Sequence, residues 1–167
     1  MASPLDNLSG PGKVLSAEPS DATEFAGLKR SGLVRLKDAE NAANSLESRF
    51  DLAYNAAHAL ALAALRWHGY RSSKRYIVFQ VLPHTLGLGP EVWRVLSKCH
   101  DVRNVGEYEG DLNVDERIVA DLVSACRAVA AKLGELQSPQ GGASCKAACA
   151  AKCRRCLCEH CGSTASR

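Results

Sequence analysis

The chain has 167 residues, of which 46% are hydrophobic and only 5% aromatic, and its formal net charge is +3. This length suits one domain with a sizeable core and is short for two, and the few aromatic residues leave Ala, Leu and Val to build most of the interior. The charge excludes a uniformly basic nucleic-acid-binding surface, because five basic residues and one acid follow from Cys145 onward and the rest of the chain carries −1.

The sequence contains neither a recognisable secretory signal nor a membrane span. Met1 to Asn7 lacks the basic start and the apolar run of a signal peptide. The most apolar stretch, Ala56 to Leu65, is interrupted by His58 and is shorter than the ~20 residues that a bilayer-crossing helix needs. We therefore expect a cytoplasmic protein that does not contact membranes.

Local patterns in the first half of the chain predict an arm and two helices. Residues 1–32 are rich in Ser, Pro, Gly and Asp with scattered apolar residues, which is typical of a loosely ordered arm. A short helix is expected over Leu33 to Ala43. The next helix begins at Asn44-x-x-Glu47, which matches a capping box, and its apolar residues follow helical spacing. Gly69 is expected to end this helix in the left-handed conformation.

The second half predicts further helices and a tail. Tyr76 to Leu82 has strand-like residues, but no other segment offers a partner strand, so we interpret it as a buried helical segment. Glu91 to Glu109 forms the next helix. A second capping box, Asn113-x-x-Glu116, starts the closing helix, which Gly134 ends.

These elements together predict the fold class and the domain boundaries. The expected fold is all-α, an antiparallel up-and-down bundle of four to five helices over residues 33–136. Residues 1–32 would form the loosely ordered N-terminal arm. Residues 137–167 would form a flexible Cys-rich tail, because this segment contains no large apolar residue except Leu157.

One face of the helix expected over Glu91 to Glu109 changes from apolar to polar along its length. The stripe begins with Trp93 and Leu96 and continues at spacing three and four with polar side chains: His100, Arg103, Asn104, Glu107 and Tyr108. Burying these groups is unfavourable unless they find partners. This end of the helix therefore either opens to solvent or forms a cleft against another helix or subunit.

Two structural alternatives remain open for these polar residues. In one, Arg103 pairs with Glu107 one helical turn away and the stripe is simply solvated. In the other, a second polar stripe on the preceding long helix faces it and extends a cleft. That second stripe consists of Asp51, Asn55 and His58, for which a solvated or locally hydrogen-bonded strip is the more common arrangement.

The run Arg103-Asn104-x-x-Glu107-Tyr108, late in the third main helix, resembles the motif region of HEPN domains, which are helical nucleotide-binding domains. In that family an Arg, a polar residue and a His four to six residues later form a metal-independent ribonuclease site at a dimer interface. The resemblance covers residues 33–136. It implies a homodimer that engages RNA or a nucleotide, a nucleotidyltransferase partner, and a place in a toxin–antitoxin, stress or defence system.

Carried over by position, the resemblance implies that Arg103 contacts the scissile phosphate and that Asn104 orients it. Tyr108 stands where the motif His is expected, and a Tyr with a pKa near ~10 is a poor general base for attack by a 2′-hydroxyl. His100, one turn before Arg103, is a second candidate for the proton transfers. The two resulting hypotheses are a binding module without turnover and a metal-independent endoribonuclease, and neither is expected to need a cofactor.

The Cys-rich tail supports a hypothesis of a different class. Cys153-x-x-Cys156 and Cys158-x-x-Cys161 have the ligand spacing that tetrahedral zinc prefers, although one residue between the pairs leaves no loop to wrap a metal. The bundle would then be a scaffold for a zinc-binding or thiol-binding tail. The alternative is a dispensable extension that binds soft metals or oxidises opportunistically.

Overall fold

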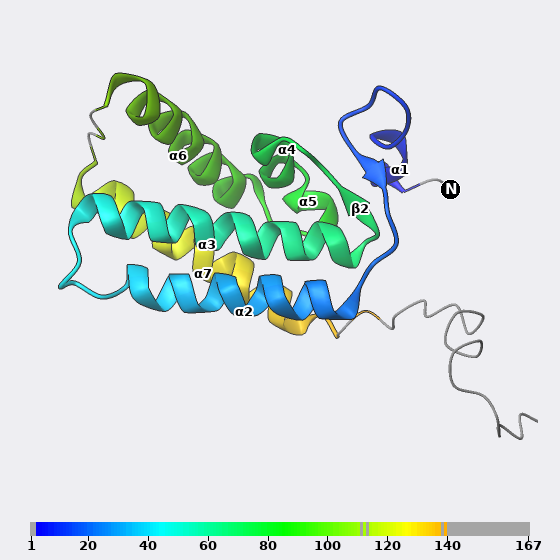
Figure 1. Cartoon of the computed structure of the whole chain (residues 1–167), viewed down its shortest axis with the longest axis horizontal. Coiled ribbons are helices and arrows are strands. Elements are labelled where there is room, and N and C mark those ends of the chain that lie inside the picture. The colour runs from blue at the N-terminus through cyan, green and yellow to red at the C-terminus, as the bar shows by residue number, and fades with distance from the viewer. Residues whose placement is uncertain (1–2, 111, 113, 138, 140–167) are drawn as a thin grey trace, which may run out of the picture.

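The computed structural model describes residues 3–110, 112, 114–137 and 139, and within these residues four long helices form the body of the protein. They are α2 (Ala22–Ala39), α3 (Leu46–Trp67), α6 (Pro90–Glu109) and α7 (Glu116–Glu135). Successive long helices run in opposite directions (Figure 1). The prediction of an all-α antiparallel bundle is confirmed. In the described part of the chain, no helix has the length and hydropathy required to cross a membrane.

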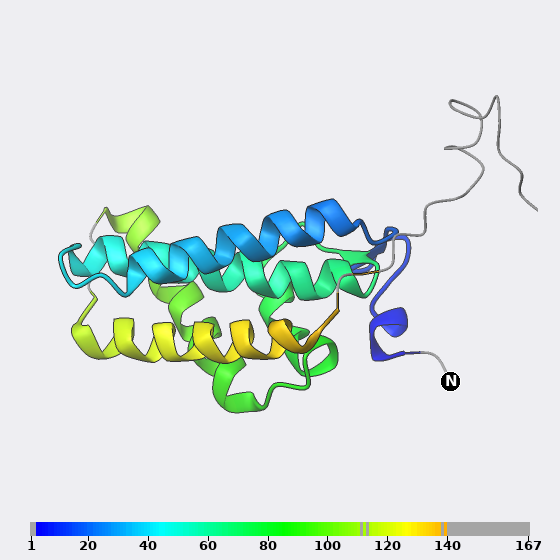
Figure 2. The same cartoon turned by 90° about the horizontal axis from the view of Figure 1, so that it is seen from below.

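The helix α3 lies at the centre of the bundle, with α2 and α7 packed along it (Figures 1 and 2). Its buried surface is built largely from alanines, including Ala53, Ala57, Ala61 and Ala64. Small side chains let neighbouring helix backbones approach closely. Gly32 of α2 shows how close this approach is, because a Cβ added there would lie 2.6 Å from Cγ of Leu60.

The structure corrects the predicted boundaries of α3 and α7 by one to two residues. The N-cap of α3 is Ser45, whose hydroxyl accepts a hydrogen bond from the Ser48 backbone N–H at 3.3 Å, and the N-cap of α7 is Asp115. The predicted boxes at Asn44 and Asn113 were therefore wrong in register, because a neighbouring side chain with an equivalent oxygen caps each helix; Asn113 itself lies outside the described residues. Helix α7 also continues past Gly134 to Glu135. Gly69 does take the left-handed conformation after α3, with φ of 81°.

The first 32 residues differ most from the sequence-based prediction. Helix α2 begins at Ala22, eleven residues before the predicted helix at Leu33. Before it lie the short helix α1 (Pro4–Asn7) and strand β1 (Ser16–Ala17), which pairs antiparallel with β2 (Tyr70–Arg71). The expectation of a loosely ordered arm was wrong for residues 3–32, because their scattered apolar side chains pack into the core: Leu5, Leu15 and Phe25 are buried. Scattered burial of this kind leaves no periodic pattern in a sequence.

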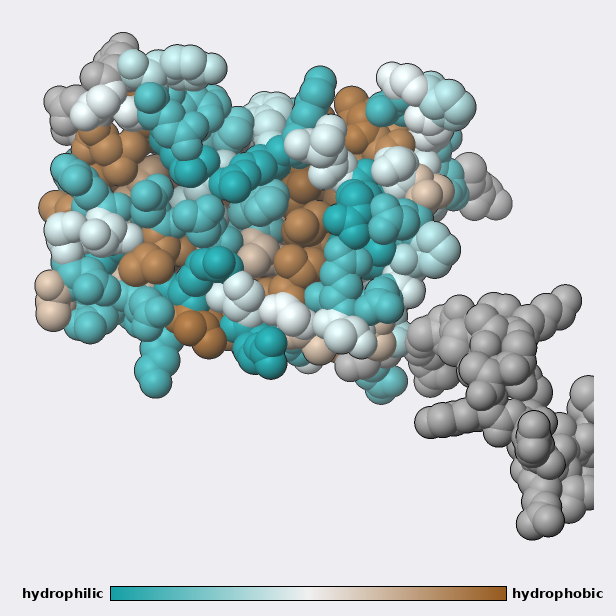
Figure 3. Space-filling view, in the orientation of Figure 1, coloured by the Kyte–Doolittle hydropathy of each residue, from teal (hydrophilic) through white to brown (hydrophobic). Residues whose placement is uncertain are grey.

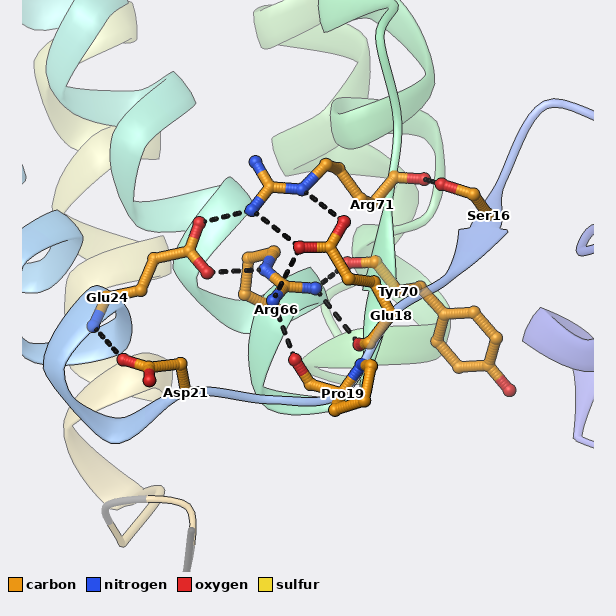
Figure 4. Close-up of polar contacts among 8 residues, drawn as sticks. All are labelled: Ser16, Glu18, Pro19, Asp21, Glu24, Arg66, Tyr70 and Arg71. Carbon is orange, nitrogen blue, oxygen red and sulfur yellow. Dashed lines mark hydrogen bonds and ion pairs between the residues drawn. The ribbon is translucent and has the colours of Figure 1, made fainter. Parts of the chain in front are cut away.

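A charged cluster around the buried Arg66 ties this N-terminal segment to the end of α3 (Figure 4). The Arg66 side chain is 2% exposed, and it donates hydrogen bonds to Glu24 Oε2 and to the Pro19 carbonyl, both at 2.8 Å. Arg71 bridges the carboxylates of Glu18 and Glu24. The hydrogen bond from Arg71 lowers the pKa of Glu18. The cluster thus neutralises charges that would be unfavourable to bury singly.

Two short helices, α4 (Arg75–Gln80) and α5 (Leu82–Thr85), connect β2 to α6. They confirm the helical interpretation of Tyr76 to Leu82. Helix α4 packs on both α3 and α6, and Val78 and Phe79 anchor it in the core. This packing brings the start of α4 beside the polar half of α6.

The predicted metal ligands Cys153, Cys156, Cys158 and Cys161 lie outside the described residues.

Candidate functional site

The polar stripe of α6 lies against α3 and α4, and hydrophilic residues dominate the surface over α6 (Figure 3). Leu96 and Cys99 are buried and hold the first half of the helix in the core. In the second half His100, Arg103 and Asn104 are partly buried. The structure therefore brings these three predicted site residues together.

Tyr108 does not join them. Its side chain is 91% exposed, and it does not line the pocket described below. The four-residue spacing from Asn104 keeps Tyr108 on the same helix face, but its side chain extends into solvent. Tyr108 is therefore not positioned to assist Arg103.

Tyr54, a buried residue of α3, connects the parts of the site. Its hydroxyl oxygen lies 2.7 Å from Nδ1 of His100, and Nε2 of His100 lies 3.1 Å from Nδ2 of Asn104. The Arg103 guanidinium lies over the Tyr54 ring, 5.0 Å from its centroid. Burial raises the pKa of Tyr54, so the hydroxyl stays protonated. Because Nδ2 of Asn104 can only donate, Nε2 of His100 accepts from it, and Nδ1 carries the proton and donates to the Tyr54 oxygen. Tyr54 thus holds both His100 and Arg103 in place.

Arg103 is oriented by its neighbours but its donors are incompletely used. Its Nη2 lies 2.7 Å from Oε1 of Glu107, and its Nε lies 3.6 Å from Oδ1 of Asp51, which is beyond hydrogen-bond distance. Among the described residues, Nε of Arg103 is a buried nitrogen that makes no hydrogen bond. Because Nε is itself buried, an added carboxylate or phosphate would have to pair with the Nη groups of this side chain, which is 20% exposed.

An open pocket of about 550 Å³ lies between the start of α4 and the polar half of α6. Its lining combines three permanent cations with aromatic and polar groups and one carboxylate: Lys74, Arg75, Tyr76, His100, Arg103, Asn104 and Glu107. We call it the α4–α6 pocket. Because its cations outnumber its acids, the local potential favours an anionic ligand.

A second pocket of about 350 Å³ lies on the opposite side of Arg103 and has the opposite charge balance. Its ionisable lining consists of Glu47, Asp51 and Glu107, with Arg103 as the cation. Arg103 therefore separates an acidic hollow from a basic one. An anion is expected to approach it from the α4–α6 side, where Arg75 and Lys74 add to the attraction.

The second polar stripe lies beside this site and is in part locally hydrogen-bonded, because Nδ2 of Asn55 donates to the Asp51 carbonyl at 2.8 Å and the Asp51 side chain is 58% exposed. Asp51 faces Arg103, and Oδ1 of Asn55 accepts a hydrogen bond from Arg75 at 3.3 Å. The ring of His58 packs edge-on against Phe79, 6.0 Å between centroids. Burial, helped by the neighbouring Arg75 and Arg103 charges, lowers the pKa of His58 to about 4. His58 is therefore neutral near pH 7 and adds no positive charge to the site.

Tyr54 of α3 and the residues that α4 contributes were not identified from the sequence. Tyr54 looked like one more apolar-face residue of its helix, and only its hydroxyl hinted at a polar partner. The signal for α4 was the basic pair Lys74-Arg75 directly before a hydrophobic segment. Its proximity to Arg103, 28 positions later, depends on how α4 packs and is not visible in any local pattern.

Comparison of this chain with known protein families, curated proteins and solved structures finds no match. The functional argument therefore rests on the residues and their geometry. In the described part of the chain, no cluster of three or more His, Cys, Asp or Glu residues has an arrangement suited to a metal ion. The buried thiols of Cys99 and Cys126 are also unreactive, since burial raises the pKa of each to about 12.

Proposed function

We propose that this chain is a HEPN-like domain that binds RNA or a nucleotide in the α4–α6 pocket, as a component of a toxin–antitoxin, stress or defence system. The observation that carries the proposal is the cationic lining of that pocket, in which Arg103 and Asn104 of the resembling motif meet Lys74 and Arg75. A homodimer and a nucleotidyltransferase partner belong to the same proposal. The exposed ring of Tyr108 offers a contact for such a second molecule.

Each lining residue has a chemical role in this proposal. Arg75 and Arg103 pair with phosphate oxygens, and Lys74 adds positive charge at the entrance. The ring of Tyr76, with a centroid 5.6 Å from that of His100, offers a face on which a base can stack. The Asn104 amide supplies both a donor and an acceptor. Binding of this kind depends strongly on salt concentration, because it releases counterions from the phosphates.

A metal-independent endoribonuclease is the second candidate, and one observation favours His100 as its proton-transfer residue. His100 lines the α4–α6 pocket whereas Tyr108 does not. Both imidazole nitrogens are engaged, Nδ1 with Tyr54 and Nε2 with Asn104. Substrate would have to displace the longer contact, at 3.1 Å to Asn104, before Nε2 accepts a proton from a 2′-hydroxyl.

The deciding experiment compares wild-type protein, Arg103→Ala and a matched control, Arg94→Ala, for binding and cleavage of mixed RNA in EDTA. Arg94 is exposed on the same helix and lines neither pocket beside Arg103, so it controls for the lost charge. We expect Arg103→Ala to weaken RNA binding about tenfold or more, with Arg94→Ala close to wild type. Equal binding by all three proteins would disprove the proposed site.

Cleavage is read from the same samples by gel electrophoresis. RNA that is cut by wild type and Arg94→Ala but intact with Arg103→Ala would establish the endoribonuclease. His100→Gln would then be expected to bind RNA without cutting it. RNA that stays intact in every sample, with binding lost only in Arg103→Ala, would establish the binding module.

A further inference from the structure

The outer face of α2 carries a groove of about 340 Å³ that is remote in sequence from the α4–α6 pocket. We call it the α2 groove, and it is lined by Phe25, Ala26, Lys29, Arg30, Leu33 and Val34. Leu33 is 43% exposed and Val34 is 55% exposed. Helix α2 packs on α3 and α7 through its other faces (Figures 1 and 2). The exposure of Leu33 and Val34 places both side chains at the surface.

The lining of the α2 groove contains two cations, Lys29 and Arg30, and no acid. Helix α2 carries two further cations, Arg35 and Lys37, and two acids, Glu24 and Asp38. Among the described residues, none of these four cations forms an ion pair. Lys29 instead lies over the Phe25 ring, 5.9 Å from its centroid. By contrast, the side chains of Arg49, Arg66 and Arg103, which are 20% exposed or less, each pair with a carboxylate.

We propose that the α2 groove binds a segment of a partner protein in which apolar side chains are flanked by Asp and Glu. The buried Phe25 ring forms a floor, and Leu33 and Val34 form a wall that an apolar side chain can contact. Lys29 and Arg30 at the rim pair with flanking carboxylates, which fixes the register of the segment and speeds its association. An amphipathic helix that presents apolar anchors at spacing three and four meets both requirements.

Charge complementarity also decides against other occupants. A second copy docked through the same groove would bring two sets of these cations together. The residues from Cys145 onward carry five basic residues and one acid, so they are repelled in the same way. Nucleic acid would use the cations but not the apolar floor. A lipid surface usually takes a helix with a wider apolar face than Leu33 and Val34 supply.

The test is an NMR titration of the full-length, isotope-labelled protein with three probes. The first is a helical peptide with Leu at spacing three and four and Glu at the flanking positions, the second has Lys in place of Glu, and the third is a phosphatidylglycerol vesicle. We expect saturable shifts with the Glu peptide only, confined to the residues of the α2 groove. The charge reversal Lys29→Glu, Arg30→Glu should weaken binding at least about tenfold.

Two controls keep the result interpretable. The double variant Arg94→Glu, Lys98→Glu changes the net charge by as much as Lys29→Glu, Arg30→Glu does, but at exposed positions of α6. It should bind the Glu peptide as wild type does. Leu33→Ser, Val34→Ser should abolish binding while leaving the helical circular dichroism unchanged. The proposal is overturned if the Glu peptide gives no saturable shifts up to about 1 mM, if the Lys peptide binds equally well, if only vesicles bind, or if both charge-reversed proteins bind alike. None of these outcomes depends on the RNA site.

Discussion

Arg66 and Arg103 are two arginines beside carboxylates in the same bundle, and they differ in how many of their donors are used. Every N–H of Arg66 faces an acceptor: Glu24, the Glu18 carboxylate, and the carbonyls of Glu18, Pro19 and Tyr70. Its side chain is 2% exposed, whereas that of Arg103 is 20% exposed and keeps Nε without a hydrogen bond. A saturated arginine connects parts of the fold, and an unsaturated one beside an open pocket is available to a ligand.

The surroundings of the two arginines explain this difference. Arg66 lies in the last turn of α3, where its charge is favoured by the helix dipole and where the chain from β1 to α2 passes close by. Backbone carbonyls can therefore complete its hydrogen bonds. Arg103 lies between side chains of separate helices, and the acids near it, Asp51 and Glu107, are both more than half exposed. Water or a ligand must complete its coordination.

The largest expected effect is on stability and comes from the saturated arginine. Arg66→Leu should lower the free energy of unfolding by about 3 kcal/mol, because it leaves carbonyls unsatisfied and two carboxylates facing Arg71 alone. Chemical denaturation with circular dichroism measures this change. Arg66→Lys serves as the control, since it keeps the charge but not the fork of donors, and we expect an intermediate loss. A loss below about 1 kcal/mol for Arg66→Leu would mean that the cluster does not hold the N-terminal segment.

The second effect is on the pH dependence of stability, which should differ between His58 and the Arg66 cluster. The pKa of His58 is about 4 in the folded protein and ordinarily 6.5, so the unfolded state binds the proton more readily. Stability is therefore expected to fall as pH decreases from about 6.5 to about 4, by roughly 3 kcal/mol at the lower end. The Arg66 cluster should respond at more acidic pH, because the pKa of Glu18 lies below its ordinary value of 4.5.

His58→Gln isolates the histidine contribution. Denaturation curves collected at several pH values should show a flatter dependence in this variant between pH 6.5 and 4, with the decrease below that range retained. A direct NMR titration of the His58 ring gives an independent value. An unchanged slope in His58→Gln, or a ring that titrates near 6.5, would contradict the burial of His58 beside Arg75 and Arg103.

Arg103→Ala, unlike Arg66→Leu, should have a small effect on stability and a large effect on RNA binding. We expect a loss of about 1 kcal/mol or less in unfolding free energy, from the contact with the Tyr54 ring and two solvent-screened ion pairs. RNA binding should nevertheless weaken about tenfold or more. Measuring both quantities on one preparation tests the comparison. A stability loss as large as that of Arg66→Leu would make Arg103 a structural residue as well.

The smallest expected effect, on stability and on RNA affinity, comes from removing the Glu107 carboxylate that pairs with Arg103. Glu107→Gln removes a carboxylate that lines the α4–α6 pocket and lies 2.7 Å from Nη2 of Arg103. Unfolding free energy should change by less than about 0.5 kcal/mol, since the pair is exposed. RNA affinity should rise about threefold at low salt and less at high salt. Weaker binding would show that Glu107 orients Arg103 for the ligand and does not compete with it.

Most of the helical architecture could be predicted because it depends on local chemistry. The apolar spacing of α3 and α7 and the left-handed Gly69 are properties of short segments, and each appeared in the structure near its expected position. The polar change along α6 was also visible, and it led to His100, Arg103 and Asn104. Capping was less predictable, because adjacent Asn and Ser residues offer equivalent oxygens and only the helix register selects one.

Only the tertiary structure decided which segments far apart in the sequence are in contact. Leu5, Leu15 and Phe25 looked like scattered apolar residues until the β1–β2 pairing and the Arg66 cluster placed residues 3–32 on the bundle. Lys74 and Arg75 became part of a pocket only because α4 packs across α3 and α6. By itself the sequence determined the helices α3, α6 and α7 and the polar face of α6, since those depend on residues three and four positions apart. Which cations meet across helices depends on packing, which carries no local signature.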